Sequence, residues 1–422
     1  MSRSTPPKTG EEQAVPDQAP EPCSLLRNRN FICYLAGRLV ASLGGQMLTV
    51  AVGWELYERT GDALALGLVG LSQIIPMVLL TLPAGHTADN YSRKRVIILS
   101  ELVLFLSCAA MAWLSLAKAP VPWMYACLFL NGAARTFLWP ASASFLPQLV
   151  PRSQFAKAVT WNSGSFQLSA VAGPAIGGAL IARFHSAALI YGLNAAAAVF
   201  CSILIGAIAC QTVALARQKM TLKTLIAGFH FVFETRIILG IITLDLLAVL
   251  FGGATALLPI YAKDILHKGP NGLGLLQSAL PMGSLIIAFA LAHRTPMRKA
   301  GRSLLWAVAI FGVATIAFGV SQNFPFSFAM MFLCGAVDNV SVVVRHTLVQ
   351  LLTPDEMRGR VSAVNSLFIG TSNELGGFES GFVAHLTTPV FAVVSGGVGT
   401  LLVVVMIALV FPEIRKYGRL DS

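Results

Sequence analysis

Hydrophobic residues are grouped into long apolar runs that are separated by short polar segments along most of the chain. A helix needs about 20 apolar residues to cross the ~30 Å hydrocarbon core of a bilayer, and each run reaches or approaches that length. No run alternates apolar and polar residues with the period of two that a membrane β-strand shows. The pattern therefore predicts twelve transmembrane helices, at 31–54, 63–84, 96–117, 122–146, 159–182, 187–209, 238–260, 273–292, 303–320, 326–352, 361–383 and 389–411.

The composition is that of a membrane protein. Only 12% of the 422 residues are charged, against about 25% in a typical soluble domain, and 55% are hydrophobic. So few charges could not cover the surface of a soluble chain of this length. The seven cysteines are scattered, without a CxxC pair or a Cys/His cluster, and predict neither a disulfide scaffold nor a metal site. The predicted fold class is an all-α integral membrane protein.

The basic residues are distributed unevenly over the segments between the apolar runs. If the N-terminal tail is cytoplasmic and the chain crosses twelve times, 22 of the 30 lysines and arginines fall in cytoplasmic segments and 5 in external ones. Cytoplasmic loops carry an excess of lysine and arginine, so this bias predicts a multi-pass protein of a bacterial-type cytoplasmic membrane with both termini in the cytoplasm. The net charge of +11 is thereby attributed to orientation in the lipid bilayer, and no nucleic-acid partner is predicted.

The second half of the chain repeats the first. With a shift of 203 residues, eleven of the fifty positions between 129 and 178 are identical, among them the pairs Gly132/Gly335 and Asn162/Asn365. Shared Gly and Asn are harder to attribute to a common apolar composition than shared Leu or Ala. The repeat predicts two pseudosymmetric six-helix bundles, an arrangement in which transporters hold their substrate between the halves.

Polar stretches divide the chain into five predicted regions. Residues 1–27 are rich in Pro, Glu and Gln and have no apolar core, which predicts a disordered cytoplasmic tail. Between the bundles, Leu222, Leu225 and Phe229 share a helical face opposite Lys219, which predicts an interfacial amphipathic helix, although a calmodulin-type partner site has the same pattern. The regions are the tail 1–27, the N-terminal bundle 28–210, the linker 211–236, the C-terminal bundle 237–412 and the cytoplasmic tail 413–422.

The segment that follows the second apolar run reads GHTADNYSRKR, from residue 85 to residue 95. It resembles the signature loop of the major facilitator superfamily, G-x-x-x-D-[RK]-x-G-[RK]-[RK]-[RK]. Asn90 and Ser92 depart from that pattern, and the residues that match it are Gly85, Asp89, Arg93, Lys94 and Arg95. The fifth run contains a segment similar to the GP-x-x-GG motif of exporting members of the superfamily, at Gly173, Pro174, Gly177 and Gly178.

The resemblance extends from about residue 25 to residue 416. It looks closest to the branch that contains the enterobactin exporter and related secretion or multidrug-efflux proteins, through the segments 54–61 (WELYERTG), 147–151 (PQLVP) and 358–360 (RGR). The resemblance implies the major facilitator fold, a cytoplasmic gate that a contact of Asp89 closes, and a kinked fifth helix that seals the cavity against protons. In a simpler interpretation the basic residues only orient the chain in the membrane, and the glycines only allow close helix packing.

A few ionisable residues lie inside the apolar runs, where a charge costs at least ~2.5 kcal/mol on insertion scales and marks a candidate functional residue. Arg135 and Asp338 each lie three residues after a Gly that the repeat shares, so we expect them to face each other across a central cavity and to bind a polar part of the substrate. A static ion pair that only stabilises packing is the alternative. The candidate substrate and cavity residues are Arg38, Arg135, Asp338, Arg345, Trp139 and Phe166.

Coupling to protons requires a carboxyl group that is neutral in one state and charged in another. Three acids within the runs of the second half are candidates. Asp245 lies near the middle of the seventh run and Glu374 near the middle of the eleventh, and both rank before Glu379.

Together these features predict a secondary active transporter that exports a small amphipathic compound (a siderophore, a drug or a secreted metabolite) by alternating access, coupled to protons and as a monomer. A flippase for an amphipathic lipid, or a non-transporting receptor or assembly protein of the same fold, is the alternative. The sequence contains no P-loop (GxxxxGK[ST]) for ATP and no nucleophile–base motif of an enzyme. No cofactor is predicted.

Overall fold

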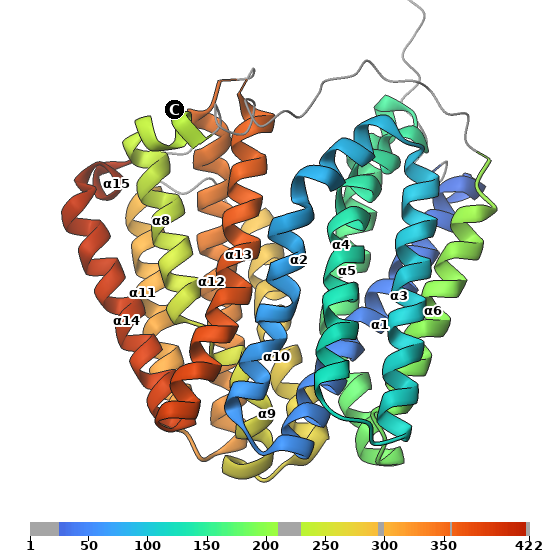
Figure 1. Ribbon diagram of the computed structural model, residues 1–422. Coiled ribbons are helices and arrows are strands. Elements are labelled where there is room, and N and C mark those ends of the chain that lie inside the picture. Colours follow the sequence, from blue (N-terminus) through green and yellow to red (C-terminus); the bar gives the residue numbers. More distant parts are fainter. Residues whose placement is uncertain (1–24, 210–228, 294–298, 355–356, 419–422) are drawn as a thin grey trace, which may run out of the picture.

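The fold is described from a computed structural model, which covers residues 25–209, 229–293, 299–354 and 357–418 (Figure 1). Within these residues all regular secondary structure is helical. The predicted tail 1–27 and the linker 211–236 therefore lie largely outside the described residues, and the predicted amphipathic helix cannot be compared with the structure beyond residues 229–234, which are helical. The region boundaries stay predictions.

Two bundles of long helices stand side by side in Figure 1. The helices of the first bundle are α1 (Arg29–Thr60), α2 (Ala63–Asn90), α3 (Arg93–Leu116), α4 (Pro122–Phe145), α5 (Phe155–Phe184) and α6 (Ala188–Gly206). The second bundle comprises α8 (Arg236–Phe251), η4 (Ala254–Leu257), α9 (Leu258–Ile260), η5 (Tyr261–Ile265), α10 (Gly269–Ala292), α11 (Ala300–Gly319), α12 (Phe324–Leu352), α13 (Arg358–Leu386) and α14 (Pro389–Val410). A short helix, α15 (Pro412–Lys416), follows.

The packing order of the helices is the same in both bundles. In the first, α4 packs on α2 and α3, α6 on α3, and α1 on α5 and α6. In the second, α12 packs on α10 and α11, α14 on α11, and α8 on α13 and α14. The internal repeat of the sequence thus appears as a repeat of helix contacts, which confirms the predicted all-helical fold of two related bundles.

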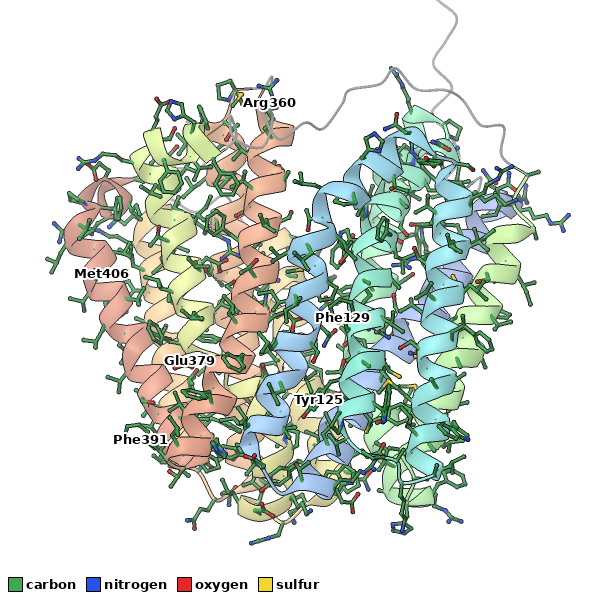
Figure 2. All side chains as sticks on the ribbon, viewed as in Figure 1. Tyr125, Phe129, Arg360, Glu379, Phe391 and Met406 are labelled. Atoms are coloured by element: carbon green, nitrogen blue, oxygen red, sulfur yellow. The ribbon has the colours of Figure 1, made fainter. Side chains whose placement is uncertain are left out.

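Ten spans of the described chain are long and apolar enough to cross a membrane, as judged by length and composition. They include all the long helices except α4 and α13, which have 24 and 29 residues and pack among the others. Large apolar side chains are exposed on the outer surface, as Figure 2 shows for Phe391 and Met406 on α14, where lipid would cover them. The exact number of twelve crossings stays a prediction.

The seventh predicted span, 238–260, differs from a single helix. It is interrupted after α8 by Gly252 and Gly253 and continues through a 3₁₀ turn (η4), α9 and a π-helical segment (η5). If a Cβ atom were added at Gly253, it would lie 2.6 Å from the carbonyl carbon of Gly376 on α13. Only glycine therefore allows α13 to approach this closely. The apolar pattern does not reveal the break, because the interrupted segment is as hydrophobic as a continuous helix.

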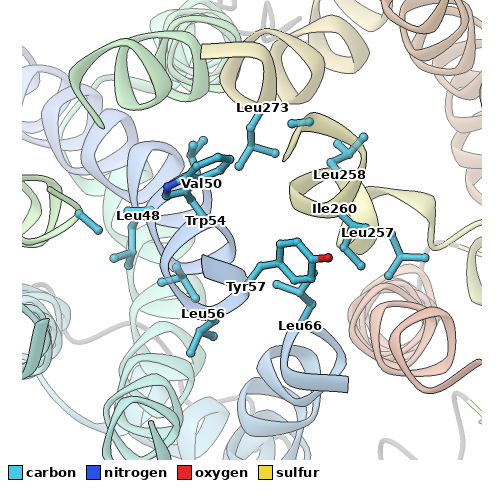
Figure 3. Close-up of a cluster of buried hydrophobic side chains, with 14 of the residues drawn as sticks. Leu48, Val50, Trp54, Leu56, Tyr57, Leu66, Leu257, Leu258, Ile260 and Leu273 are labelled. Carbon is cyan, nitrogen blue, oxygen red and sulfur yellow. The ribbon is translucent and has the colours of Figure 1, made fainter. Parts of the chain in front are cut away.

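The bundles meet at the end of the molecule where α1 leads into α2, which is the lower end in Figure 1 and is called the α1–α2 end below. Across the interface α2 packs on α13 and α5 on α10. One buried hydrophobic cluster contains residues of both bundles, including Trp54, Tyr57, Leu257, Leu258 and Leu273 (Figure 3). Toward the opposite end, where α2 leads into α3, α2 and α13 diverge (Figure 1). The molecule is therefore sealed at the α1–α2 end.

Candidate transport cavity

A central cavity of about 700 Å³ lies between the two bundles. This volume lies within the range of about 300–1,000 Å³ that is typical of small-molecule sites. Its walls come from α1, α2, α4 and α5 on one side and from the η4–α9 segment, α10, α12 and α13 on the other. Most of the wall is apolar, and the polar side chains that line it are Gln46, Thr49, Gln73, Asn131, Arg135, Thr255, Gln277, Asn373 and Glu374.

Arg135 on α4 is the cationic side chain of this wall. It is exposed to the cavity, and its Nη2 atom would lie 3.3 Å from a Cβ on Gly45 of α1. Among the described residues the structure shows no hydrogen bond to its guanidinium group and no ion pair within 4.0 Å. A guanidinium group carries five N–H donors. The cavity therefore contains an unpaired cation within the helical core of the protein.

Glu374 on α13 is the anionic side chain of the wall, and it comes from the other bundle. Its backbone is in close contact with α2: a Cβ atom added at Gly70 of α2 would lie 2.5 Å from the Glu374 carbonyl oxygen. The carboxylate and Arg135 are near enough to interact electrostatically, although they do not form an ion pair. The acid that shares the cavity with Arg135 is thus Glu374.

Asp338 was expected opposite Arg135, but it is half-buried on α12 and lines neither this cavity nor the one described next. The repeat relates residues 135 and 338 by their positions in the helices. It does not make the cavity symmetric, because the open space extends further into the first bundle than into the second.

A smaller cavity of about 210 Å³, called the side pocket below, lies entirely among helices of the first bundle. It adjoins the central cavity, with which it shares Gln46, Thr49, Asn131, Arg135 and Phe166. Two other predicted residues, Arg38 and Trp139, also line it. Its acidic residue, Glu101 of α3, was not predicted as a site residue, because Glu101 lies near the end of an apolar run.

Arg38 and Glu101 form an ion pair at the wall of the side pocket, with Nη1 of Arg38 3.6 Å from Oε1 of Glu101. The Glu101 side chain is only 1% exposed, and Oε1 has no hydrogen-bond partner among the described residues. A carboxylate that is buried this deeply needs a counter-charge, and Arg38 provides it.

The second bundle has a buried ion pair of its own, between Arg345 of α12 and Asp245 of α8, whose side chains are 4% and 11% exposed. Neither residue lines the two cavities, although Arg345 was predicted to line the substrate cavity. The third acid, Glu379 on α13 (Figure 2), accepts a hydrogen bond of 3.4 Å from the Ser380 hydroxyl group and also lies off both cavities. Of the three predicted acids, the structure places Glu374 alone in a described cavity wall.

The predicted signature loop begins later than expected. Gly85 lies inside α2, which continues to Asn90, so the helix extends beyond residue 84, where the predicted span 63–84 ends. Near the end of α2 the side-chain amide of Asn90 donates to the His86 carbonyl at 2.8 Å. The side chain of Asp89 lies outside the described residues.

The basic residues of this motif lie at the start of α3. The Lys94 ammonium group donates to the carbonyl oxygens of Gly206 and Ile208, at 2.7 and 2.8 Å, and so satisfies the C-terminal end of α6, where a cation is favourable. Arg93 is half-buried and Arg95 is exposed. In this conformation Lys94 has a structural contact within the first bundle.

The glycines of the fifth-helix motif allow two close helix crossings. A Cβ on Gly177 would lie 3.1 Å from the Met47 Cα atom, so α5 packs tightly on α1 there, and Gly173 packs on Gln46 in the same way. On the other side, a Cβ on Gly178 would lie 2.9 Å from the Cα atom of Gly274 on α10. Pro174 lines the central cavity. The motif thus brings α5 against α1 and against the second bundle.

Polar contacts cross between the bundles at the α1–α2 end. The Tyr57 hydroxyl group donates a hydrogen bond to Asp264, and the Lys263 ammonium group lies 5.4 Å from the centre of the Tyr57 ring. Asp62 and the Nδ1 atom of His385 are 2.7 Å apart. None of these residues was predicted as functional, because each lies near a predicted span end, where polar residues are common.

Two related helical bundles around a central cavity, in contact at one end, define a membrane transporter of the major facilitator type. The chain belongs to the family described as transmembrane secretion effector, which matches residues 21–421. Membership in this family of membrane transporters confirms the prediction that the protein is not an enzyme.

Curated relatives include two enterobactin exporters named EntS. The protein of Shigella boydii serotype 4 (strain Sb227) is 26% identical over 385 residues and that of Escherichia coli O1:K1 / APEC over 382 residues, with 90% of each chain covered. Solved structures with the same fold include a mutant of the nucleoside transporter NupG (TM-score 0.71, 15% identity, 91% of this chain and 100% of that one). Another is a bacterial homolog to the human lysosomal transporter Spinster in an inward-facing and occupied conformation (TM-score 0.72, 13% identity, 93% and 98% covered).

Proposed function

We propose that the protein is a secondary active exporter of a small amphipathic compound, such as a siderophore, a drug or a secreted metabolite. The observation that carries the proposal is the central cavity of about 700 Å³, which combines an apolar wall with a cation from one bundle and an anion from the other. An amphipathic compound could bury its apolar part against this wall and hydrogen-bond to the polar side chains. The enterobactin exporters among the relatives support export as the direction.

The distribution of basic residues supports an orientation in which the sealed α1–α2 end faces outward and the diverging end faces the cytoplasm. The described conformation would then receive substrate from the cytoplasm. Twelve crossings and a monomeric state complete the proposal. Transport by alternating access requires the contacts at the α1–α2 end to open while the cytoplasmic ends of the bundles approach each other.

Close glycine crossings support this movement. Gly178 meets Gly274 where α5 crosses α10, and Gly67 meets Gly381 where α2 crosses α13, so a pair of crossings joins the bundles at positions without side chains. Few side chains interlock at these crossings, so the helices can slide or roll on each other there. The Tyr57–Asp264 contact lies nearer the sealed end.

We further propose that export is coupled to protons through Glu374. A coupling carboxyl group must be reached by water in at least one conformation, and Glu374 lines the central cavity. Asp245 is less suited, because it is paired with Arg345 away from the cavities.

The test begins by comparing metabolites inside and outside cells with and without the gene, which identifies the exported compound. Its uptake is then measured in everted membrane vesicles with an imposed pH gradient. We expect gradient-dependent accumulation that Glu374→Gln abolishes and the matched control Glu58→Gln, at an exposed site, retains. Lipid translocation without accumulation would instead indicate a flippase, and neither activity would indicate a receptor. Accumulation that ignores the gradient would exclude proton coupling while leaving export intact.

A further inference from the structure

The side pocket differs from the central cavity in that a single bundle builds it. Its walls come from α1, α3, α4, α5 and α6, and it is joined to the central cavity through shared residues, including Arg135 and Phe166. A group that is bound there would stay attached to the first bundle while the second bundle moves. The pocket is therefore suited to hold one end of a substrate whose remainder lies in the central cavity.

The ionisable groups of the side pocket leave one positive charge without a partner. Arg38 is paired with Glu101 at 3.6 Å, whereas Arg135 has no hydrogen bond or ion pair among the described residues. Glu374 lies in the adjoining central cavity and contributes no wall of the side pocket. A guanidinium group binds carboxylate and other oxygen anions through charge-assisted hydrogen bonds, often two in parallel.

Two aromatic side chains stand beside this charge. Trp139 lies four residues after Arg135, on the same face of α4, and Phe166 comes from α5. Trp139 is 75% exposed and Phe166 is 47% exposed, so the ring of each residue is accessible to a ligand. Aromatic rings pack favourably on other rings in offset or edge-to-face geometry. The side pocket is also large enough for one aromatic ring: a cavity of about 150 Å³ accepts benzene, and the pocket measures about 210 Å³.

We propose that the side pocket is an anchor site for one aromatic ring that bears an anionic oxygen group, a carboxylate or a phenolate. The anion binds Arg135, and the ring packs against Trp139 and Phe166. This inference rests on the proposed export function and names the class of its substrate: a compound with an acidic aromatic end and a further amphipathic part that occupies the central cavity.

The test uses three simple probes: benzoate, its neutral analogue benzamide, and the non-aromatic acid cyclohexanecarboxylate. Their binding to the purified full-length protein in lipid nanodiscs is measured by ligand-observed NMR titration at neutral pH. The intact protein should bind benzoate about tenfold more tightly than benzamide, because the amide keeps only one acceptor oxygen for Arg135 and carries no negative charge. It should also prefer benzoate to cyclohexanecarboxylate, because the aliphatic ring cannot stack.

Two substitutions should separate these preferences. Arg135→Gln should remove the preference for benzoate over benzamide, and Arg135→Lys, which keeps the charge, should retain part of it. Trp139→Leu should weaken the preference for the aromatic acid over the aliphatic acid and leave the preference for the anion. The matched controls are Arg183→Gln and Trp306→Leu, an arginine and a tryptophan outside both cavities, and they should bind like the unsubstituted protein.

Equal binding of benzoate and benzamide, or a preference that survives in Arg135→Gln, would overturn the anchor site. Transport of the exported compound in everted vesicles is measured on the same protein. Intact transport without probe discrimination refutes the anchor site and leaves the export function standing. Probe discrimination in a protein that transports nothing refutes the export function and leaves the site.

Discussion

The Tyr57 hydroxyl group donates a hydrogen bond to the carboxylate of Asp264, which joins residues 207 positions apart in the chain. Tyr57 lies in the last turn of α1, and Asp264 lies in the π-helical segment η5 that follows the break in the seventh span. Lys263 stacks its ammonium group on the Tyr57 ring from the same segment. The contact thus ties the irregular part of the second bundle to the first bundle at the sealed end.

Removing this hydrogen bond with Tyr57→Phe should open the sealed end. A hydrogen bond to a charged group contributes about 1.5 kcal/mol or more, so the ratio of open to sealed molecules should rise about tenfold. A cysteine introduced at the cavity residue Gln277, with the native cysteines replaced, should then react faster with a membrane-impermeant maleimide added from outside.

Tyr125→Phe is the matched control, because its hydroxyl group donates to the Ala65 carbonyl at 2.9 Å within the first bundle (Figure 2). It removes the same atom without touching the interface, and the reporter should react as in the parent. Equal labelling rates in the parent and in Tyr57→Phe would show that the Tyr57–Asp264 contact does not hold the seal.

Adding a methyl group at the crossing of α5 and α10 should impair transport. In Gly178→Ala the new Cβ would meet Gly274 Cα at 2.9 Å, and relief of such overpacking costs about 1–3 kcal/mol in the sealed conformation. The same change at Gly192 on α6 meets nothing within 4 Å. Vesicle transport should therefore fall in Gly178→Ala and not in Gly192→Ala. A Gly178→Ala protein with the parent rate would argue against a tight crossing.

Breaking the buried pair of the second bundle should lower stability. Asp245→Asn leaves the Arg345 guanidinium buried without a counter-charge, which costs about 3 kcal/mol or more. Thermal unfolding in detergent should show a clear loss of melting temperature, and the double variant Asp245→Asn/Arg345→Gln should recover part of it.

Glu413→Gln breaks the exposed pair with Arg236, at 3.4 Å, and should change stability by less than about 1 kcal/mol. If Asp245→Asn melted like Glu413→Gln, burial of the Asp245–Arg345 pair would not stabilise the bundle.

Export of a compound with an acidic aromatic end should respond to the membrane potential. An anion that leaves an inside-negative cell gains about 2.3 kcal/mol per elementary charge per 100 mV. In everted vesicles without a pH gradient, an inside-positive potassium diffusion potential should therefore increase accumulation of the exported compound. Vesicles without the protein serve as the control. Accumulation that is unchanged or reduced by this potential would contradict net outward movement of negative charge.

Some of the candidate site could be read from the chain, because a charge inside an apolar run is unusual wherever the helix packs. Arg135 and Glu374 were singled out in this way, whereas Trp139 and Phe166 were predicted as aromatic lining, and the structure places all four in cavity walls. Arg345 is equally unusual in the sequence, yet it pairs with Asp245 away from the cavities. Which side of its helix faces the open space decides between these outcomes.

The sequence by itself determined that the chain is a helical membrane protein built from two related halves, because apolar length, charge bias and internal repetition are properties of local segments. Only the tertiary structure decided that Arg38 meets Glu101, that Tyr57 meets Asp264, and that the seventh span breaks at Gly252 and Gly253. The physical reason is the solvent. In water an apolar stripe marks the buried face of a helix, whereas in lipid the outer face is as apolar as the packed face, so the sequence pattern does not report how each helix is rotated.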